Sequence, residues 1–207
     1  MADAAPAYSV VIIGAGFAGI GMAVRLKRTG EGNFLVIERA DKVGGTWRDN
    51  TYPGCACDIP SHLYSFSFAP KADWSRRYPT QPEIEEYLEG CVERFGLRPH
   101  LSLGTGLKTA RFDEAADLWR LQTDAGWDLT TRILVLAMGA LHLPAVPAIP
   151  GLERFRGTAF HSARWNHAID LQDRNIAVVG TGASAIQFVP RIAGGASHLV
   201  LFQLVVR

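Results

Sequence analysis

The 207-residue sequence has few cysteines and no long apolar segment, and each shortage excludes a class of protein. Its three cysteines make an odd count and form no Cys-x-x-Cys pair, so we expect neither a disulfide framework nor a four-ligand zinc site, and we assign no metal ligands. The uncharged stretch 10–24 is too short and too rich in glycine to span a bilayer. The N-terminal residues lack the basic and apolar regions of a signal peptide, which makes the cytoplasm the expected location.

An excess of charge of either sign is also missing. Lysine and arginine total 21 against 20 aspartate and glutamate residues, which gives a formal net charge of +1. Because the basic residues are spread along the chain, we expect no partner among nucleic acids or anionic membranes. Hydrophobic residues make up 48% of the sequence, which is enough for one substantial core and marginal for two domains.

Two segments of the chain share one order of elements: a buried apolar strand, a glycine turn, a helix and a second strand. This repeat predicts an α/β fold with two Rossmann-like dinucleotide-binding units. Between them, residues 101–138 alternate apolar and polar positions around turn residues, which predicts a small antiparallel meander. The expected strands are 8–13, 34–38, 133–137, 176–179 and 198–202, and the expected helices are 16–28, 80–95 and one that ends near 193.

Three prolines between residues 144 and 150 make a stiff connector and mark the clearest domain boundary. We predict a first nucleotide-binding domain over 1–145, a linker over 146–174, and the beginning of a second nucleotide-binding domain over 175–207. The irregular stretch 39–79 is rich in glycine, proline and aromatic residues. So long an irregular stretch in a compact protein indicates a functional role.

The first glycine turn, Gly14, Gly16 and Gly19, reads Gly-x-Gly-x-x-Gly. The first glycine permits the tight turn, the second admits a diphosphate close to the backbone, and the third allows helix and strand to pack closely. Glu38 ends the next strand about twenty residues later, where its carboxylate can bind the hydroxyls of an adenosine ribose without a 2′-phosphate. The alternative is a glycine turn with a purely structural role.

The second turn, Gly180, Gly182 and Ala185, reads Gly-x-Gly-x-x-Ala and contains Ser184 as a further candidate for cofactor binding. The strand after it ends at Phe202 without an acidic residue, so NADP is the natural candidate for this site. Two dinucleotide sites in series suggest one resident cofactor and one that visits. This is the arrangement of flavin enzymes that are reduced by a nicotinamide.

The segment 44–58, GGTWRDNTYPGCACD, and the aromatic-rich SHLYSFSF after it resemble the flavin-side signature of class B flavoprotein monooxygenases. The spacing of its Gly-Gly, Trp, Tyr-Pro-Gly and Asp residues is similar to the longer pattern of the Baeyer–Villiger group. A second match lies in the linker, where Phe155, Gly157, His161 and Trp165 fit the pattern FxGxxxHxxxW of that group. The pattern normally continues with proline or aspartate, whereas this sequence continues with asparagine.

The resemblance implies an enzyme that binds FAD and NADPH and oxygenates a small molecule. In such enzymes NADPH reduces FAD, O2 adds to give a C4a-peroxyflavin, and the peroxide converts a ketone into an ester or lactone, or oxidises a heteroatom. Asp58 is implied to lie near the reactive face of the flavin and to support a catalytic arginine. His161 is a second candidate catalytic residue beside Asp58, and we expect it to make a polar contact that changes with the state of the cofactors. The implied FAD-binding residues are Gly14, Gly16, Gly19, Glu38, Gly45, Thr46 and Trp47, and the implied NADPH-binding residues are Gly180, Gly182 and Ser184.

Other interpretations of these residues stay open at the level of the sequence. Asp58 is also typical of a loop cap, Trp47 of a core residue, and His161 of a hydrogen-bonded structural histidine. For the whole protein, the alternatives are an N- or S-oxidising flavin monooxygenase and a catalytically silent FAD-binding chain. A flavin disulfide reductase is the least favoured, because the cysteines form no redox pair.

The sequence departs from the family near its C-terminal end. Family members are considerably longer, so the resemblance predicts that the second nucleotide-binding unit is truncated and that apolar faces of its sheet are uncovered. Members usually continue the last strand with Phe-Gln-Arg-Thr-Pro, whereas residues 202–207 read FQLVVR. Met138 is a milder departure, since threonine is usual there. The preference for NADPH over NADH, the substrate and the oligomeric state stay open.

Overall fold

The structure, a computed structural model, describes residues 7–203, which fall into two units. Unit 1 comprises residues 1–48, 66–71 and 84–142, and unit 2 comprises residues 49–65, 72–83 and 143–207, in each case as far as the chain is described. The departure from the family at residues 204–207 lies outside the described residues. No helix within residues 7–203 is long and apolar enough to cross a membrane.

Unit 1 is built on one six-stranded sheet. Its strands are β1 (Tyr8–Ile13), β2 (Phe34–Ile37), β3 (Leu101–Ser102), β4 (Leu107–Asp113), β5 (Leu118–Thr123) and β6 (Asp128–Leu136). They lie in the order β3-β2-β1-β6-β5-β4. β1 pairs in parallel with β2 and with β6, and β2 with β3. β4, β5 and β6 pair in antiparallel, so the predicted α/β class and the predicted meander are both confirmed.

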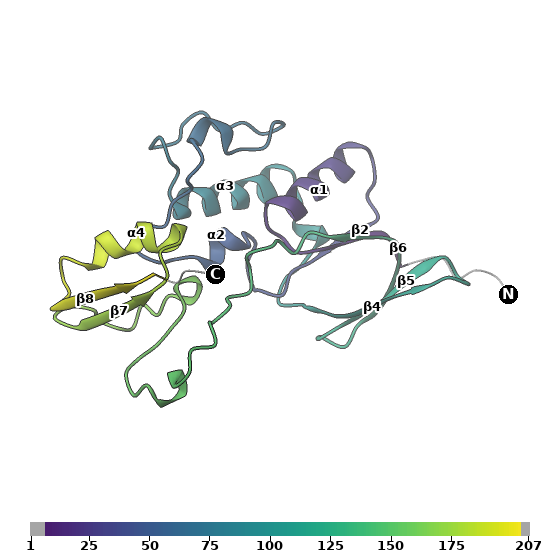
Figure 1. The fold of residues 1–207 in the computed structure, drawn as a ribbon. Coiled ribbons are helices and arrows are strands. Elements are labelled where there is room, and N and C mark those ends of the chain that lie inside the picture. The colour runs from purple at the N-terminus through teal and green to yellow at the C-terminus, as the bar shows by residue number, and fades with distance from the viewer. Residues whose placement is uncertain (1–6, 204–207) are drawn as a thin grey trace. The chain divides into compact units, whose positions relative to one another are not determined.

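The centre of unit 1 is β1, whose side chains are buried on both faces of the sheet. Ile12 packs in one cluster with Ile20 of α1 (Phe17–Arg28) and Leu88 of α3 (Gln81–Arg94). Val11 packs in the other cluster with Leu121 of the meander. Figure 1 shows α1 and α3 on the same side of the sheet. This two-sided burial explains the uninterrupted apolar run of β1, since each such side chain contributes about 1.5–3 kcal/mol when it leaves water.

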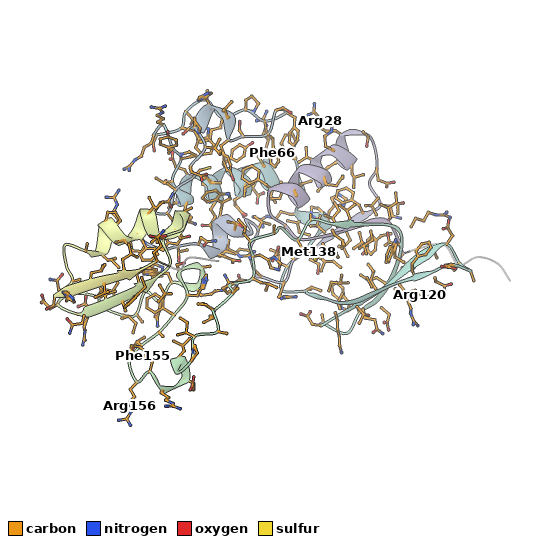
Figure 2. All side chains as sticks on the ribbon, in the orientation of Figure 1. Arg28, Phe66, Arg120, Met138, Phe155 and Arg156 are labelled. Carbon is orange, nitrogen blue, oxygen red and sulfur yellow. The ribbon has the colours of Figure 1, made fainter. Side chains whose placement is uncertain are left out.

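Aromatic residues within the irregular stretch pack against α1. The ring of Phe66, labelled in Figure 2, lies 5.1 Å from that of Phe17 and stacks on that of Phe68 at 4.8 Å. A Cβ at Gly21 would lie only 2.9 Å from the Phe66 ring, so glycine in this helix permits the close contact. The backbone N–H of Phe66 donates to the hydroxyl of Tyr87 at 2.7 Å. The aromatic content of this segment therefore fills the core beside α1 and α3.

The helix α3 begins where the capping residues predict. The Thr80 hydroxyl donates to the Glu83 carboxylate at 3.4 Å, and the same carboxylate accepts from the backbone and the hydroxyl of Ser75, both at 2.9 Å. The helix ends at Arg94, and Gly96 follows with φ of +59°. These contacts confirm the helix that the Thr80 and Glu83 pair predicts, with its end one residue earlier.

Unit 2 contains the second strand, turn, helix and strand. β7 (Asn175–Val179) and β8 (His198–Phe202) pair in parallel, and α4 (Ala183–Ile192) connects them, as predicted. The apolar side chains of Val179 and Phe202 are 47% and 51% exposed, which agrees with a sheet that lacks covering layers. The remaining short helices of the chain are α2 (Thr46–Asp49), η1 (Ser61–Leu63), η2 (Arg98–His100), η3 (Leu152–Arg154) and η4 (Ser162–Arg164).

The part of the irregular stretch that belongs to unit 2 is ordered by backbone pairing between residues 55–57 and residues 79–81. Ala56 and Thr80 form an isolated antiparallel bridge. The N–H of Cys57 donates to the carbonyl of Pro79 at 2.9 Å, and the N–H of Gln81 donates to the carbonyl of Cys55 at 3.0 Å. The pairing connects residues about two dozen positions apart, so no local sequence period could reveal it.

Candidate dinucleotide-binding sites

In the first glycine loop, residues 14–19 of unit 1, the surroundings of the three glycines differ: close backbone contacts require glycine at two positions, whereas the remaining position is open. Gly14 has φ of +104°, and a Cβ there would lie 2.6 Å from the carbonyl oxygen of Ala137. A Cβ at Gly19 would lie 1.8 Å from the carbonyl oxygen of Gly14. At Gly16 the nearest described atom would be 3.7 Å away, which is an ordinary contact. The fold itself therefore requires glycine at the first and third positions, and leaves the second position open to a ligand.

The start of α1 is suited to an anion. Gly16 is the N-cap, no side chain caps the helix, and its first turn contains no acidic residue. The amides of this turn and the positive end of the helix dipole form the usual site for a diphosphate. The segment Gly44-Gly45 lies against the loop, because the N–H of Gly44 donates to the carbonyl of Ala15 at 2.9 Å. A Cβ at Gly45 would lie 3.2 Å from Cα of Gly16, so the backbones approach closely.

Glu38 connects the end of β2 to the first glycine loop. One carboxylate oxygen accepts from the N–H of Ala15 at 2.9 Å, and the other accepts from the N–H of Ala40 at 2.9 Å. The Arg48 guanidinium lies 3.2 Å from the second oxygen, and Glu38 is 8% exposed. A carboxylate has about four lone-pair positions, so these contacts leave capacity for a ribose hydroxyl. The sequence predicted the place of Glu38 and missed its contact with the loop.

Thr46 and Trp47 lie in α2, directly after the two glycines. The N–H of Trp47 donates to the carbonyl of Gly44 at 3.2 Å, and its partly buried ring packs against the core cluster of β1 and α1. Trp47 can therefore be a core residue and still lie beside the glycine loop, so its two interpretations are compatible. The structure therefore brings Gly14, Gly16, Gly19, Glu38, Gly45, Thr46 and Trp47 together in unit 1.

The second glycine loop, residues 180–185 of unit 2, has the same outline with fewer close contacts. Gly180 has φ of +107°, and no described atom lies within 4 Å of a Cβ built at Gly180 or at Gly182. Gly182 is the N-cap of α4, again with no side-chain cap and no acidic residue in the first turn. Ala185 is 9% exposed and occupies the third position of the motif. The amide end of α4 is thus also open to an anion.

Gln187 of α4 holds the loop that precedes Asp58. Its side-chain oxygen accepts from the hydroxyl of Tyr52 at 3.0 Å and from the N–H of Ala56 at 3.2 Å. Its side-chain nitrogen donates to the carbonyl of Ala56 at 2.9 Å. Burial raises the pKa of Tyr52 to about 12, while its hydrogen bond with Ser184 acts in the opposite direction. Sequence reasoning missed Gln187, because its partner lies 131 positions away.

Asp58 lies at the end of this loop with an exposed side chain. Within residues 7–203 no hydrogen bond or ion pair holds its carboxylate, so the loop-cap interpretation finds no support there. The neighbouring Cys57 accepts from the N–H of Ile59 at 3.3 Å, and burial raises the pKa of this thiol. All three cysteines are free and buried. Among the described residues, no group of three or more histidine, cysteine or acidic side chains could hold a metal ion.

The linker carries His161 at the start of the short helix η4. Nδ1 of His161 accepts from the N–H of Ala163 at 3.1 Å, which is the contact expected of a structural cap. Trp165 packs on Phe188 of α4 with ring centroids 5.2 Å apart, and on Phe160 at 5.3 Å. Phe155 is 59% exposed, and Figure 2 shows it on the loop of the linker. Trp165 is therefore the residue that anchors this linker to α4.

Two polar contacts join the linker to the last residue of α2 and to the segment after it. His167 Nε2 and the hydroxyl of Thr51 lie 2.8 Å apart, and Arg164 lies 3.6 Å from the Asp49 carboxylate. Together with the ring of Trp165, they connect the fingerprint segment to the same part of unit 2 as Tyr52. Trp165 belongs to the pattern FxGxxxHxxxW, whereas nothing in that pattern indicated a contact of His167.

Comparison with known proteins places the chain in a family. Residues 11–193 match the family described as pyridine nucleotide-disulphide oxidoreductase. A Baeyer-Villiger monooxygenase of Streptomyces coelicolor is 53% identical over 194 residues, which are 94% of this chain and 37% of that protein. A second protein of that name, from Pseudomonas aeruginosa, is 49% identical over the same shares of the two chains.

Solved structures give the same result. A steroid monooxygenase bound to NADP has a TM-score of 0.86 and 42% identity, covering 95% of this chain and 38% of its own. OTEMO in complex with FAD and NADP has a TM-score of 0.90 and 34% identity, covering 97% and 40%. This chain thus spans less than half the length of these relatives. It belongs to the pyridine nucleotide-disulphide oxidoreductase family, and within it is similar to the N-terminal part of Baeyer-Villiger monooxygenases.

Proposed function

We propose that this chain forms the cofactor-binding part of an FAD- and NADPH-dependent monooxygenase of the Baeyer–Villiger type. The main support is the open second glycine of each loop, Gly16 and Gly182. At both positions the described protein atoms leave room for a side chain, so the approach of a ligand is the remaining reason for glycine. The relatives named above support FAD and NADPH as the two ligands.

The first loop supplies what FAD requires. The amides at the start of α1 bind the diphosphate, and Glu38, already hydrogen bonded to the loop, accepts from the ribose. Gly45, which lies against Gly16, leads into Thr46 and Trp47 beside the flavin. Bound FAD supplies the oxygen-activating chemistry, while these residues orient it and exclude water.

The second loop binds NADPH at the start of α4. Its amides receive the diphosphate, and Ser184 lies in the first turn of the helix. β8 ends at Phe202 without a carboxylate, so no negative charge opposes a 2′-phosphate there. Gln187 and Tyr52 fix the neighbouring loop, which carries Asp58.

Asp58 and His161 have different roles in this proposal. The exposed Asp58 carboxylate is available to pair with a cation near the reacting groups. Since Nδ1 of His161 accepts a backbone hydrogen bond, the neutral ring carries its proton on Nε2. That N–H can donate to a bound cofactor. The substrates of the proposed reaction are O2 and a ketone.

The cofactor half of the proposal is tested by matched glycine substitutions in the purified chain after reconstitution with FAD. Gly16→Ala should lower the affinity for FAD about tenfold, and Gly182→Ala should lower that for NADP+ about tenfold, each without a change in the melting temperature. Gly90→Ala, at a helical glycine of α3 with open surroundings, is the control. A colourless protein that cannot be reconstituted with FAD would contradict the proposal.

The reaction is tested by oxygen uptake with NADPH and a panel of ketones, amines and sulfides. Turnover of ketones to esters or lactones is the expected result. Turnover restricted to amines or sulfides would instead assign an N- or S-oxidising monooxygenase.

A further inference from the structure

Unit 2 contains a pocket of about 600 Å³ that is separate from the second glycine loop. Three segments line it: the loop of Tyr52 and Gly54, the segment 76–82, and the end of α4 at Arg191. No residue of the loop 180–185 lines it. The pocket is therefore distinct from the second glycine loop, and an inference about it does not depend on the function proposed above.

Arg191 reaches the pocket because of its register on α4. It follows Gln187 by four residues, so the two side chains leave the same face of the helix. Gln187 holds Ala56 by two hydrogen bonds, which fixes that face against the loop. Arg191 then lies over Gly54, where a Cβ would be 3.1 Å from its Cγ and 3.2 Å from its Nε. Gly54 has φ of +82°, so the turn and the arginine both favour glycine there.

Two further arginines enter from a backbone that is held in place. The N–H of Ser61 donates to the carbonyl of Arg77 at 2.7 Å, and the Ser61 hydroxyl donates to the carbonyl of Arg76. Ser61 is 6% exposed, which makes this attachment a buried one. The Arg77 guanidinium lies 5.5 Å from the centre of the Tyr78 ring, within the range of a cation–π contact.

The pocket concentrates positive charge. Arg76, Arg77 and Arg191 all line it, no lining residue is acidic, and no carboxylate within residues 7–203 forms an ion pair with any of the three. The whole chain has a formal net charge of only +1, so three positive charges in one pocket are a strong local excess. All three side chains are exposed and need no buried partner. A cluster of this kind attracts anions from solution.

We propose that this pocket is a binding site for a phosphate-bearing anion. The guanidinium group presents paired N–H donors in a plane, which matches the oxygens of a phosphate group in two-pronged hydrogen bonds. The pocket volume exceeds that of one phosphate, so a diphosphate or a small organic phosphate fits the space. The Tyr78 ring offers an apolar wall for the organic part.

The experiment is calorimetric titration of the purified chain with sodium pyrophosphate at low ionic strength, with saturating NADP+ present to occupy the second glycine loop. We expect binding that persists under NADP+. The variant with Arg76→Gln, Arg77→Gln and Arg191→Gln should bind at least about tenfold more weakly, since hydrogen bonds to charged groups have effects of this order. Arg156→Gln is the control, because Arg156 is an exposed linker residue outside the pocket, labelled in Figure 2. Its affinity should stay within about twofold of the parent.

Two results would overturn the proposal. Equal affinity of the parent and the triple variant would show that the arginines do not bind the anion. Loss of binding under NADP+ would place the anion in the glycine loop, and would leave the function proposed for that loop intact. If circular dichroism finds the triple variant unfolded, the single variant Arg191→Gln decides, with a loss of about threefold or more expected.

Discussion

The two glycine loops share one motif, but the protein surrounds them differently. At the first loop, carbonyl oxygens lie within 2.6 Å and 1.8 Å of where side chains at Gly14 and Gly19 would begin. At the second loop, Gly180 and Gly182 have open surroundings, and Ala185 replaces the third glycine. The first loop is thus tightly packed into unit 1, and Glu38 is bonded to it. The same sequence pattern therefore includes glycines that the packing of the chain requires and glycines that it does not require, and only the contacts separate the two.

The largest expected effect is that of Gly19→Ala, which tests the close packing of the first loop. We expect it to lower the free energy of unfolding by about 4 kcal/mol or more, because a backbone oxygen cannot move away from the new Cβ as a side chain can. Urea unfolding followed by circular dichroism measures the change. The opposite substitution in the second loop, Ala185→Gly, should lower stability by about 1 kcal/mol, the usual penalty of glycine in a helix. Equal effects at the two positions would contradict the difference in packing.

Glu38→Gln tests the carboxylate that the second loop does not have. The change removes the charge opposite Arg48 and one of the two oxygens that accept from the amides of Ala15 and Ala40, so we expect a loss of about 3 kcal/mol in stability. FAD content, measured by absorbance, should fall with it. NADP+ affinity should be unchanged, since Glu38 belongs to unit 1. Glu86→Gln, at an exposed position of α3, is the control and should match the parent.

Gln187→Leu tests the hydrogen bonds that lie beside the second loop in unit 2. The leucine fills similar space and leaves Tyr52 and Ala56 without their partner, which we expect to lower stability by about 2 kcal/mol. Thermal unfolding measures the loss, and titration with NADP+ measures the consequence for the loop. The control is Gln172→Leu, at an exposed glutamine of the same unit. If both leucine variants were equally stable, the contacts of Gln187 would have no energetic weight.

The smallest expected effect is a dependence on pH. The pKa of Tyr52, raised to about 12 from an ordinary 10, means that the folded chain keeps its phenol proton where the unfolded chain has lost it. The contribution of Tyr52 is therefore complete below pH 10 and declines as the pH rises from 10 towards 12. Tyr52→Phe should lower stability by about 1 kcal/mol at pH 8 and by less at pH 11 in urea unfolding. A constant difference between parent and variant would contradict this assignment.

The elements with strong local patterns could be predicted from the sequence, and the contacts between distant residues could not. β1 and β8 have the bounds that their apolar runs predict, and the capping residues Thr80 and Glu83 start α3 as expected. The position of Glu38 followed from its spacing, whereas its bond to the Ala15 amide depends on how the turn is closed. Gln187 carried no signal, because a single amide on a helix has many possible partners until the chain has folded.

The same holds for the sites. The glycines marked both loops correctly as turns before helices. The resemblance singled out the segment of Asp58 and the residue Trp165, whereas the contact of Trp165 with Phe188 is known only from the structure. The pocket of Arg76, Arg77 and Arg191 could not be predicted, because its walls come from three segments that are brought together only in unit 2. Sequence spacing predicts what lies within one element or one turn, and contacts across segments need coordinates.

The side-chain amide of Gln187 makes the two hydrogen bonds that a paired strand would make with Ala56: it accepts from the N–H and donates to the carbonyl. The helix α4 is thereby hydrogen bonded to the backbone of the loop that contains Ala56. The number of residues between Gly182 and Gln187 is therefore constrained. One inserted or deleted residue would rotate the Gln187 side chain by about 100° around the axis of α4, away from Ala56. We therefore expect this protein to tolerate substitutions in that turn of the helix more readily than changes in its length.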